Sequence, residues 1–219
     1  MSKETYSLIT KTYAKNIWRR YIKAIEEYKL ISDGDRIYVP RDLTAAGRLT
    51  YMLLKMTAEF RIYDIEIIEE DCNEEQAMLT VAEACNCNKI ALPQDFQDIM
   101  DNTLWEMLYN ARICSICPKE KSGNITIIRP LYLIHKEHIQ QWYDELSSVG
   151  NIPETSPPDI EPPSLKESQL AYIRKLLKQL SENNDAVENN VFGSVTNVDA
   201  DMLLGYNLKG EHHEFLEWY

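Results

Sequence analysis

Cysteine side chains are the first groups in this chain whose spacing could support metal or redox chemistry. Cys114 and Cys117 form a CxxC pair, which can begin a metal site or act as a redox dithiol. A zinc site needs two further ligands, and the sequence offers no second CxxC and no HxxxH. We therefore interpret this pair, and likewise Cys85 and Cys87, as free thiols and expect no metal site.

Two close pairs of histidines are the next candidates. His135 and His138 are spaced i, i+3 and could face the same way on a helix, but no carboxylate cluster of metal-site spacing accompanies them. We interpret them as the capping region at the start of a helix. The pair His212 and His213 is interpreted as part of a solvated turn.

A basic N-terminal helix with interleaved aromatic residues is a candidate nucleic-acid surface. The chain has a formal net charge of −12, yet residues 1–30 hold seven basic and three acidic residues. Such a local patch can compensate an acidic surface that otherwise repels nucleic acid. An amphipathic helix that docks its aromatic side on the core and leaves its basic residues in solvent fits the pattern equally well. The possible contacts to nucleic acid, including tRNA, are Lys15, Arg19, Arg20 and Lys23.

The sequence does not favour a phosphate-binding loop or a charged surface for a partner. Glycine occurs only 7 times in 219 residues, and no two glycines lie close enough to form a loop whose backbone amides close on a phosphate. Residues 63–101 hold eleven acidic residues and one basic residue. Charge runs of this kind are usually solvated faces, which is the interpretation favoured here over a partner surface.

Alternating strand and helix patterns predict the scaffold that positions these residues. Short apolar runs are separated by helical stretches with apolar residues three and four apart, which predicts βαβ units and a parallel sheet. The expected strands are 36–39, 61–68, 89–92 and 124–128, and the expected helices are 43–58, 74–85, 96–111 and 135–147.

A proline-rich segment divides the chain. Residues 150–164 contain five of the nine prolines, and Ser164 and Glu167 then form a capping box before another amphipathic helix. We expect an N-terminal helix over 1–30, an α/β domain over 31–149, a linker over 150–164 and a helical C-terminal extension over 165–219.

The composition also restricts the cellular setting. No apolar run approaches the roughly 20 residues of a membrane helix, and the first residues lack the apolar region of a secretion signal. The five cysteines read as reduced thiols rather than a disulfide framework. The sequence thus predicts an acidic cytoplasmic protein with no membrane partner.

Three segments together resemble the PP-loop ATP pyrophosphatases, in the branch of the tRNA 2-thiocytidine synthetases. Lys89–Asp98, followed by Thr103 and Leu104, is similar to the family block NKIALGHHFDD…ETTL. Ile127–Leu133 resembles that branch's IRPL strand, and Asn197–Tyr206 resembles the tail NVNLDTLLGY. The resemblance implies an adenine-nucleotide α-hydrolase fold, which is Rossmann-like, and a family chemistry that uses ATP–Mg²⁺ and an iron–sulfur cluster.

This sequence differs from the family at the residues that carry the family's chemistry. The family loop SGGKDS binds the pyrophosphate of ATP, but here its first position is an acid and both glycines and the lysine are lost. The histidines of GHHxDD are replaced, and the family's cluster cysteines have no counterpart in 154–163. The degenerate phosphate-loop positions are Asp42, Leu43, Thr44, Ala45, Ala46 and Gly47, and the cleft candidates are Gln94, Asp95, Asp98 and Arg129.

Coordinated loss of these groups favours a chain that kept the scaffold and abandoned the reaction, because fold alone does not imply activity. We expect a non-catalytic binding or interaction protein, a pseudoenzyme that needs no cofactor and acts through a protein partner or as a homo-oligomer. One alternative is an active ATP-dependent tRNA 2-thiolation enzyme with a rearranged site. Another is an acidic inhibitor or decoy that occupies a basic groove of another protein.

Overall fold

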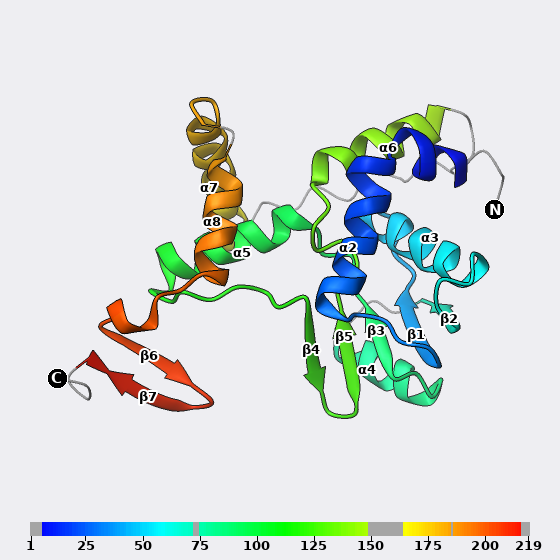
Figure 1. Cartoon of the computed structure of the whole chain (residues 1–219), viewed down its shortest axis with the longest axis horizontal. Helices are drawn as coiled ribbons and strands as arrows, with labels where there is room; N and C mark the ends of the chain where they lie inside the picture. The colour runs from blue at the N-terminus through cyan, green and yellow to red at the C-terminus, as the bar shows by residue number, and fades with distance from the viewer. Residues whose placement is uncertain (1–5, 72–74, 149–163, 185, 216–219) are drawn as a thin grey trace. The chain divides into compact units, whose positions relative to one another are not determined.

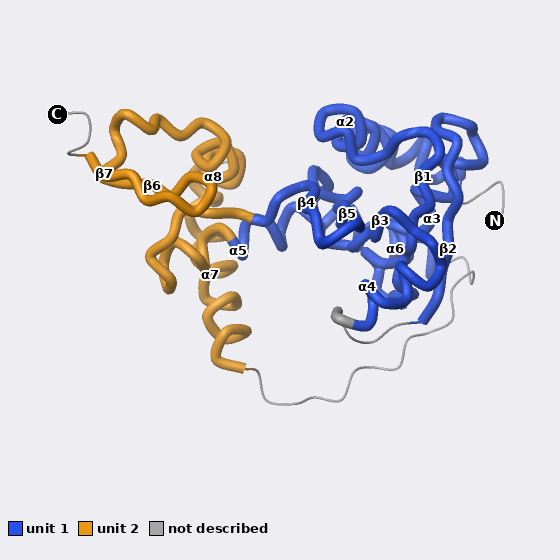
Figure 2. The backbone as a smooth tube through the Cα atoms, turned by 90° about the horizontal axis from the view of Figure 1, so that it is seen from below, with its two compact units in different colours: residues 1–102, 116–162 blue, residues 103–115, 163–219 orange. Residues whose placement is uncertain are grey.

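The computed structural model describes residues 6–71, 75–148, 164–184 and 186–215. The chain divides into two compact units (Figure 2). The first comprises residues 1–102 and 116–162, and the second comprises residues 103–115 and 163–219. This division differs from the boundaries expected from the sequence, since residues 103–115 group with the C-terminal part. No helix among the described residues is both long and apolar enough to cross a membrane.

A five-stranded sheet forms the centre of the first unit (Figure 1). Its order is β2-β1-β3-β5-β4, and the first four strands of that order are parallel. This mixed α/β architecture with a mostly parallel sheet confirms the expected fold class. The strands are β1 (Asp35–Pro40), β2 (Ile65–Glu70), β3 (Lys89–Ala91), β4 (Lys119–Ser122) and β5 (Ile125–Ile128).

The antiparallel edge strand β4 was not expected from the sequence. Its four residues read Lys-Glu-Lys-Ser and carry no apolar side chain, so no alternating pattern marks them as a strand. The strand pairs with β5 through a tight hairpin. Charged side chains on an edge strand discourage pairing with another chain, which explains this composition.

Side chains alternate between the two faces of the sheet, and each face has its own core. Ile37 and Val39 of β1 belong to the larger cluster, together with apolar residues of α2 (Arg19–Tyr28), α3 (Ala45–Glu59) and α6 (Lys136–Ser148). Tyr38 points to the opposite face, where it joins residues of α4 (Glu75–Ala84). Helices therefore cover both faces, as a parallel sheet requires.

The N-terminal helix forms, but its first part is wider than an α-helix. Two π-helical turns, η1 (Leu8–Thr12) and η2 (Ala14–Trp18), precede α2. The amide of Tyr13 donates to the carbonyl of Leu8 at 2.9 Å, which is the five-residue spacing of a π turn. Ile9, Ile17 and Tyr21 are buried in the larger core cluster, so this segment packs as part of the α/β unit.

The second unit mixes helices with a small sheet, whereas the sequence predicted only helices. The predicted capping box is present at the start of α7 (Leu165–Ser181), where Ser164 and Glu167 each satisfy the other's backbone amide. A β-hairpin then closes the chain, and His212 and His213 lie in its second strand rather than in a solvated turn. Residues 150–163 of the predicted linker and residues 216–219 lie outside the described residues. The other elements are α8 (Val187–Thr196), η3 (Ala200–Met202), β6 (Gly205–Leu208) and β7 (Glu211–Glu214).

The hairpin was missed because its strands have only four residues each and β7, which reads Glu-His-His-Glu, carries no apolar residue. Its turn has the conformation that such hairpins need. Lys209 and Gly210 adopt φ values of +51° and +88°, and two consecutive positive φ angles match the right-handed twist of the flanking strands.

An ion pair joins the first residues of β1 and β3. Nζ of Lys89 lies 2.6 Å from Oδ2 of Asp35, and both side chains are largely buried. The same Nζ donates to the carbonyl of Leu30 at 2.7 Å, and Nδ2 of Asn88 donates to Oδ1 of Asp35 at 2.8 Å. Because every charge here has several partners, the pair stabilises the structure only while it is complete.

Replacing Lys89 with Met tests this ion pair. The variant leaves Asp35 buried without a counter-charge, so we expect the free energy of unfolding to fall by about 3 kcal/mol or more, measured by urea denaturation. Lys23→Met is the matched control, because Lys23 pairs with Glu27 at 3.7 Å on an exposed helix surface. A change of no more than about 0.5 kcal/mol is expected there. Equal effects of the two substitutions would contradict the argument.

Candidate functional site

The segment between β1 and α3 contains the residues that the resemblance aligned with the family's phosphate loop, and its own side chains cap the helix. Thr44 is the N-cap residue of α3, and its Oγ1 accepts from the amide of Gly47 at 3.1 Å. The amide of Thr44 in turn donates to Oδ1 of Asp42 at 2.8 Å. Two amides that face the start of the helix are thereby used within the chain.

Gly47 allows Asp42 to lie against the first turn of α3. A Cβ atom at position 47 would lie 2.3 Å from Cβ of Asp42 and 2.7 Å from its carbonyl oxygen. Real Cβ atoms do not approach backbone this closely, so only glycine fits while Asp42 keeps this position. The one glycine that remains in this loop thus serves the contact with an acid.

A second capped helix start follows β3. Oδ1 of Asp95 accepts from the amides of Gln97 at 2.8 Å and Asp98 at 3.1 Å at the start of α5 (Phe96–Tyr109). Oδ2 of Asp98 accepts from the amide of Asp95 at 3.1 Å, which makes the arrangement a reciprocal cap. Two of the predicted cleft candidates, Asp95 and Asp98, therefore act together in fixing this helix start.

These two helix starts line one cavity with a volume of about 430 Å³. It lies beyond the carboxyl ends of β1 and β3, which are neighbours in the sheet although α3, β2 and α4 separate them in the chain. Open α/β sheets bind ligands at such points, where the strand order reverses. The lining residues are Asp42, Thr44, Ala45, Ala46, Pro93, Gln94, Asp95, Asp98, Lys136, Ile139 and Gln140.

The cavity is lined by most, but not all, of the predicted phosphate-loop and cleft residues. Leu43 is 57% exposed and Gly47 is buried, and neither lines it. Lys136, Ile139 and Gln140 of α6 were not predicted. The only sequence signal near them was the pair His135 and His138, which marked the start of this helix without indicating the cleft.

Arg129 does not line the cavity but contacts Gln94, which does. The side chain is 6% exposed, and its Nε donates to Oε1 of Gln94 at 2.8 Å. Its Nη1 donates to the carbonyl of Cys117 at 2.7 Å, and Nη2 pairs with the carboxylate of Glu120. Arg129 is therefore a positioning residue that orients Gln94 toward the cleft.

The buried carboxyl group of Asp95 is the most perturbed acid of the cleft. Burial and the neighbouring carboxylate of Asp98 raise its pKa from 3.8 to about 6, although Lys136 and the two amides at the helix start act in the opposite direction. Asp95 is only 2% exposed. It therefore ionises near neutral pH at a cost to the folded state.

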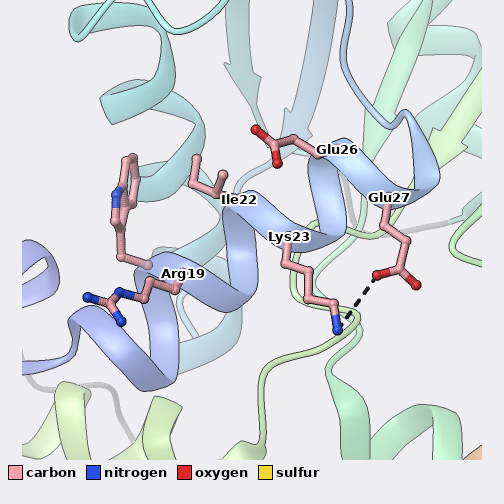
Figure 3. A pocket seen from close by; sticks show the side chains of 6 residues that line it. Arg19, Ile22, Lys23, Glu26 and Glu27 are labelled. Carbon is pink, nitrogen blue, oxygen red and sulfur yellow. Dashed lines mark ion pairs between the residues drawn. The ribbon is translucent and has the colours of Figure 1, made fainter.

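The basic residues of the N-terminal helix divide into exposed and internally bonded groups. Lys15, Arg19 and Lys23 are exposed, whereas Nη1 of Arg20 donates to the carbonyl of Leu133 at 2.8 Å. Figure 3 shows that Arg19 and Lys23 line a shallow surface hollow that also carries acidic side chains, and Lys23 pairs with Glu27. The lining residues of the hollow are Trp18, Arg19, Ile22, Lys23, Glu26 and Glu27.

The aromatic residues of the same helix face the core. The ring of Trp18 lies 5.7 Å from that of Tyr21 and 6.2 Å from that of Phe60, and Tyr21 is fully buried. This packing agrees with the amphipathic interpretation of the helix. Contact between nucleic acid and the exposed cations stays a prediction.

Cysteines and other metal-binding side chains are not gathered in the described part of the chain. Cys85, Cys87, Cys114 and Cys117 take part in no disulfide among the described residues, and burial raises the pKa of Cys87. Within the described ranges, no three His, Cys, Asp or Glu residues lie close enough together to hold a metal ion. The thiols described here therefore do not fit an iron–sulfur cluster, which needs several thiolates in one place.

Comparison with known proteins supports both the fold and the resemblance. A solved structure, the U34-tRNA thiolase NcsA from Methanococcus maripaludis with its [4Fe-4S] cluster, aligns with a TM-score of 0.56 at 8% identity over 82% of this chain and 77% of its own. This likeness shows that the two chains share a fold. No family model matches the chain.

Sequence relatives identify the branch. The tRNA-cytidine(32) 2-sulfurtransferase of Geotalea daltonii is 25% identical over 258 aligned residues, which cover 93% of this chain and 99% of that protein. The enzyme of the same name from Syntrophotalea carbinolica is 24% identical over 134 residues, which cover 60% of this chain and 50% of that protein. The chain is thus related, at low identity, to the tRNA 2-thiocytidine branch of the PP-loop proteins.

Asp95→Asn tests the electrostatic cost in the cleft. Asn keeps an oxygen for the amides of Gln97 and Asp98 but does not ionise. The raised pKa means that the folded wild type binds a proton more tightly than the unfolded chain, so its stability falls as pH rises from about 4 to about 6. Urea denaturation at about pH 4 and pH 7.5 should therefore show the variant gaining roughly 1–3 kcal/mol on the wild type at the higher pH. An unchanged difference at the two pH values would refute this.

Proposed function

We propose that this relative of the tRNA thiolation enzymes is a non-catalytic binding and interaction protein. The observation that carries the proposal is the start of α3, where Asp42 and Thr44 take the amides of Thr44 and Gly47. In the family the corresponding loop binds the pyrophosphate of ATP. Here the same place carries a carboxylate and no lysine.

Electrostatics and geometry both oppose a phosphate at this position. Two like unit charges 4 Å apart repel by about 4 kcal/mol at an effective dielectric constant of 20. Asp42 would impose this cost on an incoming phosphate, and Asp95 and Asp98 line the same cavity. The residues present therefore do not fit the polyphosphate of ATP, and no reaction step is assigned to it.

The proposal extends to the cofactors. We infer that the protein works without ATP–Mg²⁺ and without an iron–sulfur cluster, because neither the loop after β1 nor the described thiols provide the groups that hold them. A cytoplasmic location belongs to the same proposal.

Protein interaction is favoured by the surface of the second unit. Among the described residues of this unit, only Ile173 and Leu177 are buried apolar residues, whereas Met202 and Leu204 are 79% and 84% exposed. Exposed apolar side chains in this number are typical of surfaces that bind another protein. The other exposed large apolar residues of this unit are Met107, Leu108, Tyr109, Ile113, Leu165, Tyr172, Leu180, Val198 and Leu208.

Isothermal titration with ATP–Mg²⁺ tests the loss of catalysis. We expect no binding in the low micromolar range and no release of pyrophosphate, because Asp42 opposes the phosphates. Protein purified without oxygen for the same titration should contain no stoichiometric iron. Tight ATP binding with pyrophosphate release, or a stoichiometric cluster, would instead establish an active enzyme with a rearranged site.

Self-association through the second unit is tested with Leu204→Asp. Sedimentation of the wild type should reveal a dimer or larger species, and the variant should dissociate it without lowering the melting temperature, because Leu204 is exposed. Leu43→Asp is the matched control, since Leu43 is an exposed leucine of the first unit. A wild type that sediments as a monomer at high concentration would contradict self-association.

A further inference from the structure

Strand β2 forms one edge of the five-stranded sheet and has a partner strand, β1, on one side only (Figure 1). The outer backbone groups of an edge strand can pair with a further strand. The other edge strand, β4, reads Lys-Glu-Lys-Ser and has no apolar side chain, whereas β2 reads Ile-Glu-Ile-Ile-Glu-Glu. The β2 edge therefore combines apolar side chains with charges of a single sign, which the β4 edge does not.

The register of β1 and β2 determines which backbone groups of β2 point outward. The amide of Arg41 donates to the carbonyl of Glu70 at 3.0 Å, and Pro40 is the register partner of Glu70. Along a parallel strand, alternate residues bond to one neighbour, so every second residue counted back from Glu70 faces β1 and the residues between them face outward. The outward residues are Ile65, Ile67 and Glu69. Among the described residues, no backbone hydrogen bond from outside the sheet reaches these three.

The side chains of β2 lie on both faces of the sheet. Ile65 and Ile67 pack against the larger core cluster, and Ile68 packs against the smaller cluster on the opposite face. Glu66 and Glu70 share the face of Ile68, because side chains alternate along a strand. A strand added at this edge would therefore meet Glu-Ile-Glu on one face and Ile-Ile-Glu on the other.

The charge along this edge is mainly negative. Residues 64–71 hold five acidic residues and no basic residue. Two arginines offset part of this charge: Arg36 pairs with Glu66, and Arg41 lies 3.0 Å from Asp71. Because two cations do not balance five acids, the edge keeps a negative charge that attracts a basic partner.

A second copy of the same strand fits this edge poorly. It would bring three further glutamates against the three glutamates of β2, and like charges opposite each other in a sheet are destabilising. Lysine or arginine opposite these glutamates would instead form favourable cross-strand pairs. Charge complementarity thus selects a basic strand, while the isoleucines favour apolar residues at its remaining positions.

We propose that the outer edge of β2 binds an extended basic segment of a partner protein, which joins the sheet as an additional strand. The main chain of this segment bonds to Ile65, Ile67 and Glu69, and its basic side chains lie opposite the three glutamates of β2. The inference rests on the proposed interaction function and gives the chemistry of the partner.

The probe is the capped peptide Lys-Lys-Val-Val-Lys-Val, which in antiparallel alignment places a lysine opposite each glutamate of β2 and a valine opposite each isoleucine. The full chain is titrated with it at pH 7 and low salt, and amide exchange with water is measured by NMR. We expect submillimolar binding. At saturation the outward amides of Ile65, Ile67 and Glu69 should exchange at least about tenfold more slowly, whereas those of Ile68 and Glu70, which face β1, should change little.

The substitution Glu70→Lys tests the charge pairing. It should weaken peptide binding at least about threefold, because an attractive cross-strand pair becomes a repulsive one. Glu83→Lys is the matched control, since it makes the same change of charge on an exposed residue of α4, a helix that packs against β3 and β5. Binding to this control should change less than about 1.5-fold, because salt and distance screen the charge.

N-methylated peptides separate strand pairing from general attraction to an acidic protein. Methyl groups on the peptide residues opposite Ile65, Ile67 and Glu69 remove the amides that face β2 and should abolish binding. Methyl groups on the other peptide residues should leave it unchanged. Equal binding of the two methylated peptides, equal weakening by the two substitutions, or no binding of the unmodified peptide overturns the inference.

Two further results distinguish the remaining outcomes. Slow exchange of the same outward amides in the concentrated protein without peptide would assign the edge to a second copy and overturn the basic partner. Absence of peptide binding refutes only this site and leaves the loss of catalysis standing. The titration with ATP–Mg²⁺ decides that loss independently, because binding with release of pyrophosphate refutes the proposed function whether or not the peptide binds.

Discussion

The parallel pairing of β1 with β3 is the constraint on which the rest of the first unit depends. The buried ion pair between Asp35 and Lys89 joins the amino ends of these strands, and the register places Ile37 beside Lys89. Because the strands are short and run in the same direction, fixing their beginnings also fixes where their carboxyl ends stop. The loops that follow them, at Asp42 and Asp95, are thereby brought to one cavity.

Both loops satisfy the unpaired backbone amides of a helix start with side chains of the chain itself. A helix start leaves backbone amides without partners, and such amides can bind a phosphate. Here Asp42 with Thr44, and Asp95 with Asp98, satisfy amides at the starts of α3 and α5. Both helix starts are therefore capped by side chains of the chain itself.

Much of this arrangement could be predicted from the sequence, and the failures have physical causes. The apolar patterns of β1, β3 and α3 predicted a parallel sheet. The resemblance predicted that Asp42 and Asp95 lie at one cleft. Lys136 and Gln140 were not predicted as lining residues, because polar residues near the start of a helix are common on solvent-exposed helices. The hydrogen bond from Arg20 to the carbonyl of Leu133 was not predicted, because a contact to the backbone of a distant residue leaves no pattern in the local sequence.

The contact between Gly47 and Asp42 has an evolutionary consequence. The family has serine at the position of Gly47, yet any side chain there would meet Asp42 at 2.3 Å. Regaining serine alone would disrupt the loop, and replacing Asp42 alone would remove the acceptor of the Thr44 amide without rebuilding the glycines and lysine. Single substitutions therefore do not convert this loop into the loop SGGKDS, so that residues 42 and 47 can change only together.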